Sequence, residues 1–397
     1  MKFKSFFVIL VICAAFSNSF LVKMSSSSQW SISTVDGSNT NCFYTSIALD
    51  SQEYVHISYH DDIGGTLKYA YQGPNGWVTK VIDNSEEVGR HTSLALDNND
   101  NPHISYSDII GHLPENDHLF YAYQRNNEWT IEVVDSCQSG VKDTSLVLDS
   151  KGMAHIGYVG WGDIKYAYQT SSGWDITTLD TLQFDSEDIA LALDSQEYPH
   201  LVYSSESVLK HAYQNSTGWH NENIVFLNSS GFFVIDFSLK IAADDKVHIS
   251  YNDYTSKDLM YITKGNDSEW ISEVVDSFDE VGTYNSLELD KNGKVHISYN
   301  DYTNHDLKYA YQTNESWAVE TVSNEGYVGL YTSLTLDKEG YAHISYLGGA
   351  GFLGSLQYAT NNPKGIVFPS SNRSFISGFE IITTIGLIAI YTKKKTD

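Results

Sequence analysis

The sequence predicts an all-β fold, a seven-bladed β-propeller with four antiparallel strands per blade, and three observations support this prediction. The 397 residues include 28 Tyr, 28 Gly and 8 Trp, a composition that favours strands and turns. A phrase of the type His-Ile-Ser-Tyr recurs seven times, at steps of 45 to 52 residues. Each unit contains four runs that alternate between apolar and polar residues, and four short strands in a repeat of this length are typical of a propeller blade.

The four strands follow the same order in every unit. The first run ends in Asp, as in 92–97, and the second carries the repeated His and Tyr. A third run is exemplified by 67–71, and a fourth begins with Trp. The repeated histidines are His56, His103, His155, His200, His248, His296 and His343. The aspartates six residues before them are Asp50, Asp97, Asp149, Asp194, Asp290 and Asp337, with Ala242 in the remaining unit.

The distribution of the Trp strands predicts how the ring closes. A Trp strand at 30–36 precedes the first complete unit, and the last unit lacks one after Tyr358. We therefore expect residues 30–36 to pair into the last blade, because this pairing removes the exposed strand edge that an open ring would carry.

The two ends of the chain differ from the repeats. Residues 1–19 carry lysines, then a short apolar run and small polar residues, which predicts a signal peptide; a retained anchor is the alternative. Residues 20–29 form a linker, 30–360 the propeller and 361–374 a second linker. Residues 375–392 predict a transmembrane helix, because an almost uncharged segment precedes the basic tail 393–397; a last β-strand is the alternative. We expect a single-pass cell-surface protein with an extracellular propeller.

The body of the chain is strongly acidic. Eight of the 24 basic residues and two of the 50 acidic residues lie outside 30–360, which leaves this region with a net charge of −32. Such a surface repels phosphate backbones and anionic lipids, so nucleic acid is excluded as a partner. We expect an extracellular glycan or protein partner, a monomer, and contact with the membrane only through the C-terminal anchor.

Cysteines and glycosylation motifs agree with export. Cys42 and Cys137 are the cysteines of the mature body, and they could form at most one disulfide bond. Asn-x-Ser/Thr motifs, which are candidate N-glycosylation sites, occur at Asn215, Asn228, Asn266, Asn314 and Asn372.

The repeat has a recognisable form. The pattern Asp-x-x-Gly-x-x-His-Ile-Ser-Tyr, as in 290–299, resembles the repeats of secreted bacterial and archaeal propellers, which are loosely grouped with the sialidase-like (Asp-box-like) propellers. The resemblance covers 30–360. It departs from the sialidase Asp box, since Gly stands three residues after Asp and His replaces Trp. The resemblance implies a seven-bladed fold and leaves the function open.

Residues that recur in every blade are expected to have structural roles. Equivalent positions lie far apart around a ring, so the seven histidines cannot bind one metal ion. We expect each His to satisfy a hydrogen bond inside its own blade, each repeated Asp to bond turn amides, and the Trp and Tyr side chains to pack between blades. Function should therefore lie where the blades differ.

One face of the ring holds the residues that break the symmetry. This face, the loop face, carries the loops from each Trp strand to the next inner strand and the loops after the His phrase. The opposite face, the hairpin face, carries the Asp-x-x-Gly hairpins and the turns before Trp, with Asn215, Asn266 and Asn314. The candidate binding residues on the loop face are Asp61, Asp62, Arg90, Asp108, Trp161, Asp163, Asp253, Tyr254, Asp301 and Tyr302.

Three interpretations of this acidic and aromatic face are open. Aromatic rings beside carboxylates suit sugars, whose apolar faces stack while their hydroxyls bond to Asp. Carboxylates equally suit Ca²⁺, the one metal that the sequence suggests; no other cofactor is expected. A solvated acidic rim without a ligand is the third interpretation.

The candidate residues of the loop face and the small number of arginines indicate which classes of function to expect. We expect a binding module for a glycan or protein partner, with a glycan-active hydrolase or lyase and a surface spacer without a pocket as alternatives. Sialidase chemistry is not expected, because a clamp for the substrate carboxylate requires several arginines and only Arg90 and Arg125 lie in the propeller. A pair of carboxylates would suffice for another glycosidase, but the sequence does not give their separation.

Overall fold

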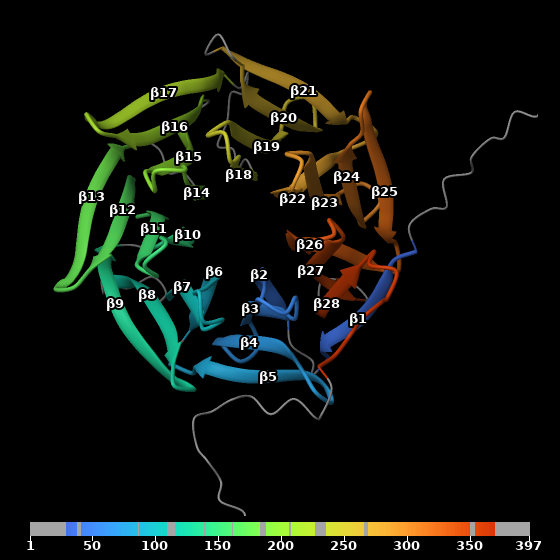
Figure 1. Cartoon of the computed structure of the whole chain (residues 1–397), viewed down its shortest axis with the longest axis horizontal. Coiled ribbons are helices and arrows are strands. Elements are labelled where there is room, and N and C mark those ends of the chain that lie inside the picture. Colours follow the sequence, from blue (N-terminus) through green and yellow to red (C-terminus); the bar gives the residue numbers. More distant parts are fainter. Residues whose placement is uncertain are drawn as a thin grey trace, which may run out of the picture.

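The computed structural model describes residues 29–369, apart from 38–40, 86, 109–115, 139, 161, 183–187, 206–207, 227–235, 266–268 and 350–353. Within these residues the chain forms seven four-stranded antiparallel sheets, which are arranged as blades around a central axis (Figure 1). The seven-bladed propeller predicted from the repeats is confirmed.

The strands of the first four blades run outward from the axis in chain order. They are β2 (Cys42–Leu49), β3 (Val55–Asp61), β4 (Thr66–Gly73) and β5 (Gly76–Asp83); β6 (Val88–Leu96), β7 (Pro102–Asp108), β8 (Asn116–Arg125) and β9 (Glu128–Gln138); β10 (Asp143–Leu148), β11 (Ala154–Val159), β12 (Asp163–Thr170) and β13 (Gly173–Thr181); and β14 (Ile189–Leu193), β15 (Pro199–Ser205), β16 (Val208–Asn215) and β17 (Gly218–Phe226).

The remaining three blades complete the ring. Their strands are β18 (Phe237–Ile241), β19 (Val247–Asp253), β20 (Asp258–Lys264) and β21 (Trp270–Asp276); β22 (Val281–Leu289), β23 (Val295–Asp301), β24 (Asp306–Gln312) and β25 (Trp317–Ser323); and β26 (Tyr327–Leu336), β27 (Ala342–Gly349), β28 (Ser355–Thr360) and β1 (Ser31–Asp36). In the last blade β1 is the outer strand, as predicted. It pairs antiparallel with β28, with Ser31 opposite Thr360, so the first and last strands lie side by side in Figure 1.

The core consists of apolar contacts between neighbouring blades. The residue after the His of each phrase, Ile in six units and Leu201 in the fourth, is fully buried, as at Ile57 and Ile297. Each repeated Trp packs edge-on against an aromatic ring of the adjacent blade; the Trp317 and Tyr261 ring centroids, for example, are 5.4 Å apart at 62°. The expected packing of Trp and Tyr between blades is confirmed, and each buried ring removes a large apolar area from water.

The repeated histidines have the local role expected of them. In the third unit His155 Nδ1 lies 2.6 Å from the Tyr166 hydroxyl, and His155 Nε2 lies 3.9 Å from a carboxylate oxygen of Asp149. The other oxygen of Asp149 accepts hydrogen bonds from the turn amides of Lys151 and Met153. The repeated Asp and His therefore hold the hairpin of their own blade.

The segments outside the described residues include several predicted features. The signal peptide, the anchor at 375–392, Trp161 and three glycosylation motifs (Asn228, Asn266 and Asn372) lie there. Among the described residues there is no helix with the length and apolarity needed to cross a membrane. Cys42 and Cys137 are both buried thiols, and neither forms a disulfide bond.

Candidate functional site at the channel mouth

A cavity of about 390 Å³ lies at the centre of the ring. The residues that line it stand at the starts of the seven inner strands. These starts directly follow the loops of the loop face. One residue of each blade occupies the same position, six residues before the repeated Asp or its equivalent. These seven residues, called the channel ring from here on, are Tyr44, His91, Asp143, Asp188, Asp236, Tyr284 and Tyr331.

The aromatic members of the channel ring have an unusual backbone. Tyr44, His91, Tyr284 and Tyr331 have φ angles between 51° and 53°, in the left-handed region. Each lies in a break of the strand register, such as the one between Thr283 and Ser286 in β22. A left-handed residue with a large side chain costs on the order of 1–2 kcal/mol. Bulges of this kind re-aim a side chain, and here all four re-aimed residues line the cavity.

The three carboxylates occupy the regular strands of the ring. Asp143 starts β10 without a register break, and Asp188 and Asp236 directly precede β14 and β18. Each carboxylate accepts a hydrogen bond from a backbone N–H of the next blade: Ile189 N lies 2.9 Å from Asp143 Oδ2, Phe237 N lies 3.0 Å from Asp188 Oδ2, and Tyr284 N donates to Asp236. Neighbouring blades thus fix all three carboxylates at the cavity wall.

The ring members contact one another around the cavity. Ring centroids are 4.5 Å apart for Tyr284 and Tyr331, 4.9 Å for Tyr331 and Tyr44, and 4.2 Å for Tyr44 and His91. His91 Nδ1 then lies 3.6 Å from Asp143 Oδ1. The carboxyl groups of Asp143 and Asp188 are hydrogen-bonded to each other. The cavity therefore has an aromatic wall on one side and a carboxyl wall on the other.

The enclosure changes the acidity of the carboxyl wall. Burial raises the pKa of Asp143 to about 6 and, together with the negative charge of Asp188, raises the pKa of Asp236 to about 7. Burial and the charge of Asp143 raise the pKa of Asp188 well above its usual value. Because the Asp143–Asp188 pair is hydrogen-bonded, one of its carboxyls holds a proton near neutral pH. The wall thus offers both hydrogen-bond donors and acceptors.

Burial also lowers the acidity of the tyrosines at the site. Burial raises the pKa of Tyr284 to about 12 and also raises the pKa of Tyr44 and Tyr331. These hydroxyls are therefore neutral donors at physiological pH, and the aromatic wall can bond ligand hydroxyls at its edges while its faces remain apolar.

One residue predicted from the sequence reaches the channel ring. Arg90 donates a hydrogen bond to the Tyr44 hydroxyl, and its Nη2 lies 3.7 Å from Asp62 Oδ1 and 3.8 Å from Glu87 Oε2. Arg90 and Asp62 thus lie at the rim of the cavity behind Tyr44. Neither these two residues nor the other candidates that the structure describes are among the residues that line the cavity.

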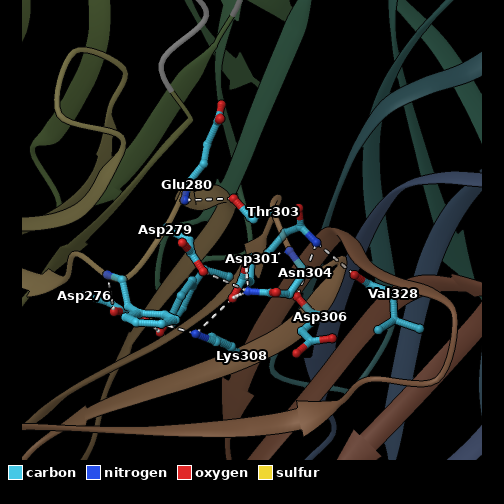
Figure 2. A network of polar contacts seen from close by, with 12 residues as sticks. Asp276, Asp279, Glu280, Asp301, Thr303, Asn304, Asp306, Lys308 and Val328 are labelled. Carbon is cyan, nitrogen blue, oxygen red and sulfur yellow. Dashed lines mark hydrogen bonds and ion pairs between the residues drawn. The ribbon is translucent and has the colours of Figure 1, made fainter.

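Three predicted carboxylates are buried inside their own loops. Asp61 lies 2.8 Å from Lys68 Nζ, Asp108 accepts hydrogen bonds from the backbone N–H of His118, and Asp301 is bonded by Asn304 and lies 3.0 Å from Lys308 Nζ. Figure 2 shows Asp301 inside this network, between Asn304 and Lys308. These contacts shape the loops, and the partners that they satisfy leave these carboxylates little capacity for a ligand.

The other predicted residues lie nearer to solvent. Asp253 accepts a hydrogen bond from Thr255 N, and Asp163 accepts one from the Thr181 hydroxyl, so both hold turns or strand ends. Tyr254 and Tyr302 are exposed. Asn215 and Asn314 lie on the hairpin face, where strands β16 and β24 turn into the Trp strands. Trp161 lies outside the described residues, so its proposed ligand contact stays a prediction.

None of the seven ring residues was among the site residues predicted from the sequence; the predicted residue Arg90 directly precedes the ring member His91. A signal was present in the sequence. When the inner strands are aligned on Ser-Leu-x-Leu-Asp, the position two before Ser or its equivalent reads Tyr, His, Asp, Asp, Asp, Tyr, Tyr. This variable position at the start of the inner strand is where the symmetry breaks next to the axis.

The structure does not favour the Ca²⁺ interpretation. In the described part of the chain, no three or more His, Cys, Asp or Glu side chains are grouped so that they could hold a metal ion. In the ring, two carboxyl groups bond each other and all three accept hydrogen bonds from backbone N–H groups, which occupies part of their capacity for a cation.

Comparison with known proteins supports the fold. No protein-family model and no curated protein matches the sequence. A catalytically inactive virginiamycin B lyase from Staphylococcus aureus, solved with quinupristin, is 8% identical with a TM-score of 0.56, over 84% of this chain and 99% of that chain. An ulvan lyase bound to a GlcA(1-4)Rha3S repeat is 11% identical with a TM-score of 0.53, over 83% and 92%.

A fucose-specific lectin from Aleuria aurantia is 9% identical with a TM-score of 0.51, over 74% of this chain and 99% of that chain. At these identities the matches show a shared fold and do not transfer a function. The propeller fold that the repeat implies is confirmed, and no family membership is shown.

Proposed function

We propose that this protein is an extracellular glycan-binding protein whose ligand enters the channel-ring cavity. The observation that carries this proposal is the composition of the cavity wall, with three tyrosines and a histidine facing three carboxyl groups. Aromatic faces suit the apolar faces of sugar rings, and carboxyl groups suit their hydroxyls. A cavity of about 390 Å³ falls in the size range of small-ligand sites, which argues against a spacer without a pocket.

The negative charge of the propeller and of the cavity wall limits which glycans the cavity could bind. The propeller carries a net charge of −32, and three carboxyl groups line the cavity. Uronate-rich or sulfated glycans would be repelled by this field. We therefore propose a neutral or amine-bearing sugar. The structural neighbours include a fucose-specific lectin and an ulvan lyase, and the electrostatics of this chain favour a ligand of the first kind.

A glycan array probed with the purified propeller tests this proposal. We expect binding to neutral or amino sugars, and at least about tenfold weaker binding after Tyr331→Ala, which removes the central ring of the aromatic wall. Tyr341→Ala, a half-buried tyrosine on the hairpin face, is the matched control and should bind like the wild type. Binding confined to sulfated or uronate-containing glycans would contradict the proposal.

A second candidate function is glycoside hydrolysis in the same cavity. The observation that favours it is the hydrogen-bonded Asp143–Asp188 pair with raised pKa values next to Asp236. The bond between the anomeric carbon and the glycosidic oxygen would break, with Asp188 donating its proton to that oxygen. The Asp236 carboxylate would take a proton from the attacking water, whose oxygen bonds to the anomeric carbon. Such a hydrolase releases a new reducing end.

Reducing-end release from the glycans that bind on the array separates the two functions. A hydrolase would lose turnover in Asp188→Asn and keep most of its affinity, because the amide cannot donate a proton to the leaving group. If no product forms during long incubation with the wild type, the protein acts by binding alone.

We further propose that residues 375–392 anchor the propeller to the cell surface, as the apolar sequence and the following lysines suggest. Truncation before Phe375 should release the protein into the medium, whereas the chain with its tail should stay with the cells. Unprocessed full-length protein in the medium would overturn the anchor proposal.

A further inference from the structure

The loop face carries large exposed aromatic side chains beside the cavity, on loops of blades five and six. Tyr254 is 52% exposed on the β19–β20 loop, Phe278 is 70% exposed on the β21–β22 loop, and Tyr302 is 54% exposed on the β23–β24 loop. Tyr254 and Tyr302 both lie within electrostatic range of the Lys257 ammonium group, so the two loops are neighbours. Exposed aromatic residues gathered on neighbouring loops commonly mark a binding surface.

These residues continue the aromatic wall of the cavity outward. Tyr302 N is hydrogen-bonded to Glu280 O at 2.9 Å, and Glu280 directly precedes β22, the strand that carries Tyr284 of the channel ring. The ring of Tyr302 then meets His305 at 6.2 Å, and His305 stacks on Tyr327 at 4.0 Å. His305 and Tyr327 are half-buried, so the aromatic surface extends from the cavity over blades six and seven.

The loops that carry these side chains are held by contacts between blades. Tyr302 N donates to Glu280 O at 2.9 Å, and Glu280 N donates to the Thr303 hydroxyl at 3.0 Å, a contact visible in Figure 2. Lys257 Nζ lies 2.7 Å from Glu280 Oε2, and Val328 N donates to His305 O at 3.1 Å. A surface fixed in this way loses little conformational entropy when a ligand binds.

Polar groups accompany the aromatic residues. Asp279 accepts a hydrogen bond from the Asn304 side chain at 3.3 Å, and Figure 2 shows Asp279, Thr303 and Asn304 side by side. The charged side chains among the polar groups of this surface are Asp279, Glu280 and Lys257, and Thr303 and Asn304 are neutral. The combination of apolar rings with amide, hydroxyl and carboxylate groups suits the alternating apolar faces and hydroxyl edges of successive sugar units.

We propose that Tyr254, Phe278, Tyr302, His305 and Tyr327 form outer subsites for an extended neutral oligosaccharide whose terminal unit lies in the channel-ring cavity. This inference rests on the proposed glycan-binding function and names its substrate class, a polymer rather than a single sugar. The cavity alone accommodates a small ligand, whereas the aromatic track gives additional units a surface that continues from it.

Binding constants over a length series test this proposal. The probes are neutral homo-oligosaccharides of glucose, mannose, galactose and N-acetylglucosamine, from monosaccharide to hexasaccharide. We expect affinity to rise with length in the series that binds, and Tyr302→Ala to weaken the longer probes by about three- to tenfold while leaving the monosaccharide unchanged. Tyr302→Phe keeps the ring and should bind like the wild type.

The controls separate this inference from the proposed function. Ile63→Ala, an exposed apolar residue at the corresponding loop of blade one, should change no binding constant. Both alanine variants should keep the wild-type melting temperature, because exposed substitutions are nearly neutral for stability. Binding that is independent of length and of Tyr302 would overturn the subsites and leave the cavity proposal intact. Absence of binding to every probe by the wild type would overturn the outer subsites, and the glycan array tests the cavity proposal separately.

Discussion

At the residue scale, the channel ring shows how one position in a repeated strand acquires several roles. In all blades this position faces the axis, so its side chain decides the chemistry of the cavity. Four blades place an aromatic residue there in a left-handed conformation, and three place an aspartate there in an extended one. The aromatic residues retain a strained backbone that a smaller residue would relieve, which is the pattern expected where a side chain is kept for binding.

Replacing one strained aromatic residue should separate stability from binding. Tyr284→Asn removes a ring from the cavity wall and places at φ 52° a residue that tolerates this conformation. We expect the free energy of unfolding to change by less than about 1 kcal/mol, because relieved strain offsets lost packing. Glycan affinity should fall at least about tenfold. Calorimetry and titration check both values, and a large drop in stability without loss of binding would contradict the assignment.

The carboxyl wall predicts a pH dependence of stability. A carboxyl whose folded pKa lies above its unfolded value near ~3.9 stabilises the fold when protonated, and this contribution is lost as pH rises through the folded pKa. For Asp143 and Asp236 the folded values are about 6 and about 7. The contribution of the wall to the free energy of unfolding should therefore decrease from about pH 4 to about pH 7 and level off at higher pH.

The variant Asp188→Asn tests whether the carboxyl wall causes this pH dependence of stability, because it removes the charge between the Asp143 and Asp236 carboxylates. We expect the variant to be more stable than the wild type at pH 8, on the order of 1–3 kcal/mol, and to show a flatter pH profile. Asp175→Asn, an exposed carboxylate on β13, is the control and should leave the profile unchanged. Equal pH profiles of the wild type and Asp188→Asn would show that the wall does not titrate in this range.

At the element scale, the inner strands are of two kinds, which differ in how they begin. β10, β14 and β18 begin in regular register, whereas β2, β6, β22 and β26 begin with a break. In β22 the break needs Gly282, whose φ is +95° and whose Cβ, if present, would lie 2.9 Å from Leu259 Cα. The strand of the preceding blade thus leaves room only for glycine, and this close approach sets the bulge that aims Tyr284 into the cavity.

Gly282→Ala should therefore disturb both the strand and the site. We expect a loss of about 2–4 kcal/mol in unfolding free energy, because the methyl group clashes with backbone and the left-handed conformation is strained. Gly293→Ala is the matched control, since Gly293 has φ +74° and open space around its Cβ position; it should cost only about 1 kcal/mol. Chemical denaturation measures both, and similar values for the two variants would refute the close-approach explanation.

At the scale of the whole molecule, the same kinds of contact recur between most adjacent blades, including the pair that joins the chain ends. Ile47 N donates to the Ser333 hydroxyl at 3.2 Å, as Leu94 N does to Ser46 at 3.0 Å elsewhere in the ring. On the hairpin face Lys338 N donates to Glu53 Oε1 at 3.0 Å, as Ser51 N does to Asp100 Oδ1 at 2.8 Å. With β1 in place, the first and last blades are therefore joined by the same kinds of hydrogen bond as other neighbouring blades.

Removal of β1 should weaken the last blade and its contact with the neighbouring blade. A chain that starts at residue 37 exposes the edge of β28 and loses the contact of Trp30 with Tyr309, whose ring centroids are 5.3 Å apart. We expect a lower melting temperature and concentration-dependent aggregation, since an unpaired edge strand can pair with other chains. A chain that starts at residue 29 is the control. Light scattering and thermal unfolding decide, and equal behaviour of the two chains would show that β1 is dispensable.

The sequence by itself determined the repeat, the number of blades, the order of strands and the closure by 30–36, because these depend on local alternation of residues and on a count of Trp strands. It also indicated the structural roles of the repeated His and Asp, which bond within their own blade. The face that carries the site followed from strand direction, and Arg90 was placed near it.

The channel ring needed the tertiary structure. Asp143, Asp188 and Asp236 are about 45 residues apart in sequence, and only ring closure brings their side chains to one cavity. Their raised pKa values arise from mutual enclosure, which no local pattern records. Conversely, Asp61, Asp108 and Asp301 satisfy their hydrogen bonds inside their loops, so their exposure could not be judged from composition. Which acidic residues face a ligand is a property of packing between distant strands, and the structure alone decided it.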